Sequence, residues 1–175
     1  SLTSMIFNLF RKPPVAPDAV HEIYRSIVAQ SRQERFYADW GVADTVTGRF
    51  DMVSLHLALY LRRLKNEPSA RVFTQALVEL FFKDMDRSIR ELGVTDLGVP
   101  KKIKTMGNVF YGLVNVLAPA LDSGVPANVE AALVRNVYGS PNPGAALLAA
   151  YLLDESVRLA ALSAVELVPA SGIAA

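Results

Sequence analysis

The side chains that most often bind metals or carry out catalysis are few in this chain. It has 175 residues, no cysteine and two histidines, His21 and His56. Glu22 follows His21, but the second histidine of a zinc-binding helix is missing, so the sequence predicts no histidine-rich metal centre. Without cysteine there is also no thiolate ligand and no disulfide. We therefore expect no metal and no other cofactor.

Other common catalytic motifs are missing from the sequence as well. The segment from Gly41 to Gly48 is not followed by Lys-Ser/Thr, as in a phosphate-binding P-loop, and no G-x-S-x-G pattern occurs. Asp84 and Asp86 are two residues apart, a spacing that directs the two carboxylates to different sides of a helix. A paired-carboxylate site would need a third element. We therefore expect a protein that is not an enzyme.

The composition indicates an apolar protein with little net charge. Hydrophobic residues make up 51% of the chain, and the mean hydropathy of +0.26 is high for a soluble protein. Such a value indicates either an unusually apolar interior or exposed apolar patches that are kept for a partner. The net charge of +1 excludes the broad basic face of a nucleic-acid-binding protein.

Apolar residues recur at helical spacing along the chain, and no segment shows the sustained alternation of a strand. The expected helices begin near Asp18 and then cover about 46–66, 70–92, the residues after Pro100, 127–138 and 145–165. The helix over 46–66 has two apolar strips, so we expect it to be central. Aromatic residues form the junction before it: Phe36, Tyr37 and Trp40.

These patterns predict an all-α fold, a single compact domain of about six helices. The expected parts are a flexible N-terminal segment over 1–17, the helical domain over 18–168 and a frayed tail over 169–175. The segment from Thr105 to Leu121 carries no charge, but Gly107, Gly112 and Pro119 interrupt it. We therefore do not expect it to span a membrane.

Asp84 is the most informative ionisable residue of the expected helix over 70–92. Its neighbours three, four and seven residues earlier are Phe81, Leu80 and Leu77, so its carboxylate shares the apolar side of the helix. A buried carboxylate must find a donor. We therefore expect Asp84 to anchor the junction of the expected helices over 46–66, 70–92 and after Pro100, with an exposed acidic contact as the alternative. The candidate donors are Arg49, His56, Lys102, Lys104 and the Thr45 hydroxyl.

Three further positions have more than one interpretation. We interpret His56 as a semi-buried, hydrogen-bonded residue, with a contact on a partner-binding surface and a titrating switch as the alternatives. Asp86 is expected to face solvent and to pair with Arg90 at i+4. Lys101 and Lys102 follow Pro100, where cations oppose the helix dipole. They are either a solvated pair balanced by Asp96, which we adopt, or a site for a partner's carboxylate or lipid headgroups.

Near its start the chain has an apolar plug with a basic edge. This pattern predicts either shallow insertion at an anionic membrane surface or packing against the domain itself. The residues of the plug are Ile6, Phe7, Leu9, Phe10, Arg11 and Lys12.

Three segments carry a resemblance to a known family. Asp44 to His56 has the pattern D-T-x-x-G-R-F-D-x-x-x-L-H, and Phe82 to Asp96 has F-x-D-M-D-x-x-x-R-E-x-G-V-x-D. Lys101 to Gly112 has K-x-V/I-K-x-M-x-x-x-F-Y-G. Together they resemble the ubiquinol–cytochrome c chaperone family, the helical assembly factors of the respiratory cytochrome bc complex. Leu113 departs from the family, in which an arginine is common after the glycine.

The resemblance implies a chaperone that holds newly made cytochrome b while haem is inserted and other subunits join. It also implies a small co-chaperone and the ribosome as further partners. Because no Arg-rich transit segment is visible, we expect a bacterial member in the cytoplasm, peripheral to the inner membrane. The family pattern mixes packing with contact, so several of its residues are expected to be structural. The partner-binding residues that it implies are Asp44, Thr45, Arg49, Phe50, His56, Asp84, Asp86, Arg90, Lys101, Lys102, Phe110 and Tyr111.

Two other functions stay open at this point. One is a peripheral membrane or lipid-binding helical protein that has no cytochrome client. The other is a small-molecule-binding domain or an unrecognised enzyme, for which an enclosed pocket with convergent polar groups would be evidence.

Overall fold

The computed structural model describes residues 17–168, and within this range it contains helices and no strand. Six of these helices have eight residues or more, which confirms the predicted all-α fold of about six helices in one domain. The helices are α2 (Pro17–Ser31), α3 (Glu34–Ala38), α4 (Val46–Leu64), α5 (Arg71–Glu91), α6 (Val99–Ser123), α7 (Pro126–Leu133), α8 (Gly144–Ala161) and α9 (Ala164–Leu167).

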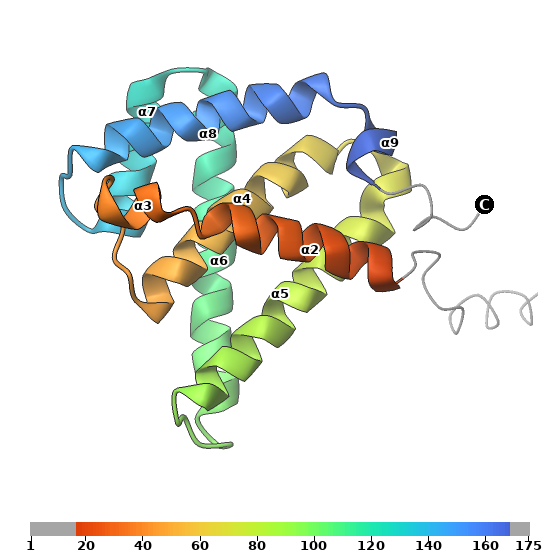
Figure 1. Cartoon of the computed structure of the whole chain (residues 1–175), viewed down its shortest axis with the longest axis vertical. Helices are drawn as coiled ribbons and strands as arrows, with labels where there is room; N and C mark the ends of the chain where they lie inside the picture. The colour runs from red at the N-terminus through yellow and green to blue at the C-terminus, as the bar shows by residue number, and fades with distance from the viewer. Residues whose placement is uncertain (1–16, 169–175) are drawn as a thin grey trace, which may run out of the picture.

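Helix α4 is the central element, as its two apolar strips predict. It packs against α2, α5, α6 and α8, and α2 crosses in front of it in Figure 1. Every side chain from Met52 to Leu59 is buried, including Ser54 and His56. A helix that is covered on all sides has such a continuous buried run, whereas a surface helix has a stripe.

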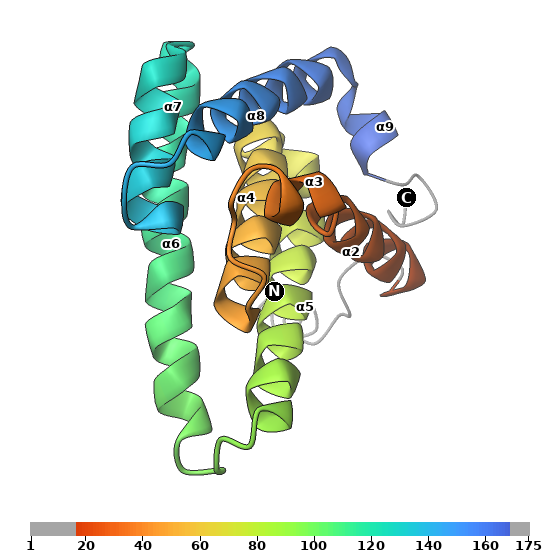
Figure 2. The same ribbon diagram turned by 60° about the vertical axis from the view of Figure 1, so that its left-hand side comes forward.

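Helices α5 and α6 form a hairpin with its own start and stop signals. Gly93 follows the end of α5 with φ +86°, and its N–H donates to the carbonyl of Arg90 at 2.9 Å. Pro100 lies in the first turn of α6, where its missing N–H costs no helical hydrogen bond. The two helix ends thus agree with the helices expected over 70–92 and after Pro100. The connection over 92–98 lies at the bottom of Figures 1 and 2, at the opposite end of the molecule from α8.

The C-terminal part differs from the prediction in two places. The single helix expected over 145–165 is wrong, because the chain breaks between α8 and α9. Ser163 caps α9 in a capping box: its hydroxyl accepts the N–H of Glu166, and the Glu166 carboxylate accepts the N–H of Ser163 at 2.6 Å. The helix expected over 127–138 is α-helical only to Leu133 and ends in a π-helical turn, Val134–Tyr138.

The predicted aromatic junction contains a short helix, α3, and is fixed to the C-terminal half. Phe36 is fully buried, and its ring lies 5.0 Å from that of Tyr151. The carbonyl of Trp40 accepts a hydrogen bond from the Tyr138 hydroxyl at 2.8 Å. A Cβ at Gly144 would lie 1.8 Å from the same oxygen, so only glycine lets α8 begin this close to the junction.

No helix within residues 17–168 has the length and the apolar character needed to cross a bilayer. This result includes α6, which contains the uncharged segment from Thr105 to Leu121.

Candidate functional site

The first family-like segment builds the N-terminus of α4. Thr45 is the N-cap, and its Oγ1 accepts the N–H of Gly48 at 3.1 Å. Gly48 is required because a Cβ there would lie 1.8 Å from the carbonyl oxygen of Ala43. Arg49 and Asp44 form an exposed ion pair at 2.9 Å. Thr45 and Gly48 therefore have structural tasks, while Asp44 and Arg49 lie on the surface.

The second segment lies on α5 up to Glu91 and continues into the connection, and its helical residues point to three sides of α5. Met85 is buried in the core, and Asp86 is half-exposed and bonds Arg90 at 2.9 Å, which confirms the predicted i+4 pair. Phe82 faces α6, where its ring lies 6.2 Å from that of Tyr111 in a stacked arrangement. Phe110 lies beneath them, 1% exposed.

Asp84 faces α2, on another side of α5. The hydroxyl of Tyr24 donates to its Oδ2 at 2.8 Å, and Arg87 forms an ion pair with it. Burial and this hydrogen bond raise the pKa of Tyr24 above its ordinary value. Asp84 therefore joins two helices, but the predicted junction with α4 and α6 and the predicted donors there are wrong, because its partner lies on α2. Sequence patterns do not reveal that α2 crosses α5 at this point.

An open hollow of about 700 Å³ lies between α5 and α6, and we call it the α5–α6 groove. Gly107 lets the Phe82 ring lie against α6, because a Cβ there would be 3.0 Å from the ring carbon Cε1. Tyr111 is 51% exposed, so the groove presents an accessible aromatic face. The second and third family-like segments meet here. The groove is lined by the apolar or aromatic Val78, Phe82, Ile103 and Tyr111 and by the polar Gln75, Glu79, Lys83 and Asp86.

A smaller hollow of about 310 Å³ lies between α2, α4 and α5, and we call it the α2–α4–α5 hollow. Its lining contains Phe50 and Arg49 of the first segment and Asp84 of the second. Arg32 and Arg87 also line it. The two family-like segments on α4 and α5 thus come together on this side of α5, while the α5–α6 groove lies on the other.

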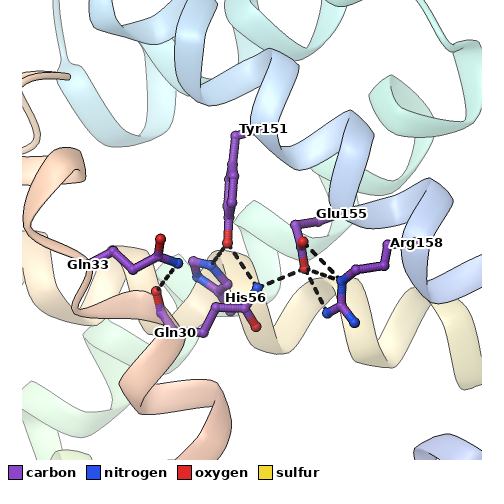
Figure 3. Close-up of polar contacts among 6 residues, drawn as sticks. All are labelled: Gln30, Gln33, His56, Tyr151, Glu155 and Arg158. Carbon is purple, nitrogen blue, oxygen red and sulfur yellow. Dashed lines mark hydrogen bonds and ion pairs between the residues drawn. The ribbon is translucent and has the colours of Figure 1, made fainter.

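His56 lies at the centre of a polar network rather than on the surface (Figure 3). Its Nδ1–H donates to the carbonyl of Met52 at 2.7 Å, and its Nε2 accepts from the Tyr151 hydroxyl at 2.8 Å. Gln30 donates to Tyr151 at 3.0 Å and to Glu155 at 2.7 Å. Burial lowers the pKa of His56 below its ordinary value, so the ring is neutral near pH 7.

The burial of His56 and Phe110 corrects one part of the sequence analysis. Their side chains are 2% and 1% exposed, so neither is part of the surface to which a partner could bind. The hydrogen bonds of His56 agree with the interpretation that we adopted. Sequence reasoning could not find its partner, because Tyr151 lies 95 residues further along the chain.

The basic residues at the start of α6 are arranged differently from the prediction. Lys101 and Lys102 are exposed, but Asp96 forms an ion pair with Arg90 instead of balancing them. The apolar plug, Ile6 to Lys12, lies outside the described residues, so its role stays a prediction.

Asp51 is a further candidate that the sequence analysis did not single out. It is the final aspartate of R-F-D in the first segment and lies on α4. Burial raises the pKa of its carboxyl to about 7. An acid that is half protonated near neutrality is uncommon outside functional sites and ion-pair networks. The sequence signal that could have identified Asp51 is its position in the family pattern.

Comparisons with known proteins agree with this picture. A family model described as "Ubiquinol-cytochrome C chaperone" matches residues 38–172. Among solved structures, the chain is similar to the one titled "Crystal structure of the Cbp3 homolog from Brucella abortus". The two are 39% identical, with a TM-score of 0.80, and the match covers 90% of each chain. No curated protein sequence matches the chain.

Proposed function

Because this chain belongs to the ubiquinol–cytochrome c chaperone family, we propose that its client is newly made cytochrome b, which it holds during assembly of the cytochrome bc complex. Its role in the biogenesis of that complex follows from the family. The choice of cytochrome b as client comes from the family resemblance. The α5–α6 groove supports it as a surface that suits a client with transmembrane helices. Binding alone, without catalysis, is sufficient for this role.

The α5–α6 groove is the observation that carries the proposal. A client with transmembrane helices offers apolar segments and basic loops. The groove offers the apolar side chains of Val78 and Ile103 beside the stacked rings of Phe82 and Tyr111. Glu79 on its edge adds a carboxylate for a basic loop.

A small number of anchors would supply most of the binding energy. Aromatic residues in partly enclosed positions are typical hot spots, and Tyr111 combines a large apolar area with a polar end. Its ring is held by Phe82, which Gly107 in turn allows to lie close to α6. This pre-organisation lowers the entropy that the side chains lose on binding.

The remaining exposed residues of the family pattern lie apart from this groove and suit other contacts. Asp44 and Arg49 lie near the α2–α4–α5 hollow, on the other side of α5. We assign this side to a small co-chaperone or the ribosome, because a client in the α5–α6 groove leaves it accessible. Thr45 and the buried His56 and Phe110 act indirectly, by fixing α4 and α6.

Photocrosslinking in cells that make cytochrome b tests the proposal. A photoreactive residue replaces Tyr111 in the groove or, as the control, Val116, which is 44% exposed on the same helix and does not line the groove. We expect label on cytochrome b from position 111 and much less from position 116. Equal labelling from both positions, or label only on lipid from position 111, would contradict the proposal.

A further inference from the structure

The connection between α5 and α6 exposes two large aliphatic side chains. Leu97 is 94% exposed and Leu92 is 59% exposed. The adjoining ends of the two helices are filled by the buried Ile89 and Val99, so the leucines add nothing to the core. In both views the connection is at one end of the molecule, below the other helices (Figures 1 and 2). A convex apolar tip of this kind fits a flat surface better than a pocket.

Three lysines follow the tip in the first turns of α6: Lys101, Lys102 and Lys104. All are exposed, and none has an ion-pair partner among residues 17–168. The aspartates of the hairpin are already paired with arginines on α5. These pairs are Asp84 with Arg87 and both Asp86 and Asp96 with Arg90.

The acids near the tip cancel only part of the charge of these lysines. Asp96 is the only acid within the connection, and it shares Arg90 with Asp86. Glu91 lies at the end of α5, before the connection begins. Between residues 84 and 104, five positive charges stand against four negative ones, a net charge of +1. The three lysines gather at the start of α6, next to the positive end of the helix dipole. Like charges at that position are unfavourable unless anions approach them.

We infer that this tip docks on an anionic phospholipid bilayer. Leu92 and Leu97 enter the boundary between headgroups and acyl chains, which interfacial segments penetrate by about 5–10 Å. Lys101 and Lys104 lie two and five residues after the first residue of α6, about 3 and 8 Å along its axis. Their flexible side chains thus reach the level of the lipid phosphates.

The type of basic residue favours lipid over a protein partner. Arginine can bind a fixed carboxylate with two parallel hydrogen bonds. The arginines of this hairpin, Arg87 and Arg90, are already paired with aspartates of the protein itself. The cations of the hairpin that have no ion-pair partner among residues 17–168 are lysines, which act as flexible point charges and suit a fluid layer of phosphates. The inference goes beyond the proposed function and requires no cytochrome client.

Co-sedimentation of the full chain with vesicles tests the inference. We expect binding to vesicles of phosphatidylcholine with phosphatidylglycerol and little binding to phosphatidylcholine alone. The triple change to glutamine, K101Q/K102Q/K104Q, should weaken binding to the anionic vesicles about a hundredfold, near fivefold for each lysine. The double change L92S/L97S should weaken it at least tenfold. The control is Leu147→Ser, since Leu147 is 51% exposed on α8, away from the tip.

Two results would overturn the inference. One is that the wild-type chain does not bind anionic vesicles. The other is that both tip variants, folded by circular dichroism, bind them as the wild type does, as they would if only the plug from Ile6 to Lys12 made contact. Crosslinking from position 111 to cytochrome b is measured separately. If the wild-type chain does not bind anionic vesicles while crosslinking to cytochrome b is intact, only the docking tip is rejected. If the wild-type chain binds vesicles through the tip but does not crosslink to cytochrome b, only the proposed client is rejected.

Discussion

Replacing Gly48 by alanine should destabilise the protein, although alanine is the better helix former. The added Cβ would lie 1.8 Å from the carbonyl oxygen of Ala43, where ordinary contact begins at 3.4 Å. The two must separate by the difference, 1.6 Å. Ala43 cannot move freely, because Val42 beside it is buried and donates its N–H to the carbonyl of Phe36 at 3.0 Å.

The expected size of the effect follows from three contributions. Forcing a methyl group into filled space costs about 1–3 kcal/mol. Moving the Thr45 cap away from the N–H of Gly48 costs about 1 kcal/mol more. The higher helix propensity of alanine stabilises the folded state by about 1 kcal/mol relative to glycine. The net loss is about 2 kcal/mol, which for a chain of this size lowers Tm by about 4–8 °C.

Gly112→Ala is the matched control, because it makes the same chemical change within a helix. A Cβ at Gly112 meets nothing within 4 Å. This variant should gain up to about 1 kcal/mol from helix propensity and melt slightly above the wild type. Thermal unfolding followed by far-UV circular dichroism compares the three proteins. A Gly48→Ala variant that melts at or above the wild-type temperature would refute the reasoning.

Three further predictions concern polar groups. Tyr151→Phe leaves the buried Nε2 of His56 without its hydrogen bond and should cost about 1–3 kcal/mol in urea unfolding; an unchanged midpoint would show that water replaces the hydroxyl. Tyr24→Phe removes the donor to Asp84 and should cost about 1–2 kcal/mol by the same measurement, with no loss expected if α2 does not depend on this bond. The pKa of Asp51 is raised from 3.8 to about 7, so the folded state holds more protons than the unfolded state between these values. Stability should therefore fall as pH rises from about 4 to 7, and Asp51→Asn should remove this part of the slope; equal slopes in both proteins would contradict the assignment.

Local signals made most of the helices predictable. Gly93 marks the end of α5, because the chain there adopts a positive φ that favours glycine. Pro100 marks the start of α6, because its missing N–H costs no hydrogen bond in the first turn of a helix. The break before α9 was also readable, since Ser163 and Glu166 have the spacing of a capping box. Apolar periodicity alone had extended the helix across it. The π-helical turn after Leu133 has no comparable sequence signal.

The candidate site was less predictable, because it depends on pairs that are distant in sequence. The charged and apolar residues of the α5–α6 groove could be recognised in the sequence, but the position of the groove depends on how Phe82 packs beside Gly107. Asp84 needed a donor, yet Tyr24 lies 60 residues earlier, on a helix whose crossing with α5 no local pattern specifies. Tertiary packing decides such pairs.

The hydrogen bonds between the end of α4 and the end of α8 determine when, during synthesis, the N-terminal helices can complete their folding. Arg63 donates to the carbonyls of Leu159 and Leu162, 96 and 99 residues further along the chain. Until α8 has left the ribosome, the ring of Phe36 lacks its contact with Tyr151. The end of α4 also lacks the hydrogen bonds that Arg63 makes to Leu159 and Leu162. The first helices therefore cannot mature as an independent unit, and a nascent chain that stalls before α8 should be a substrate for proteases rather than a working chaperone.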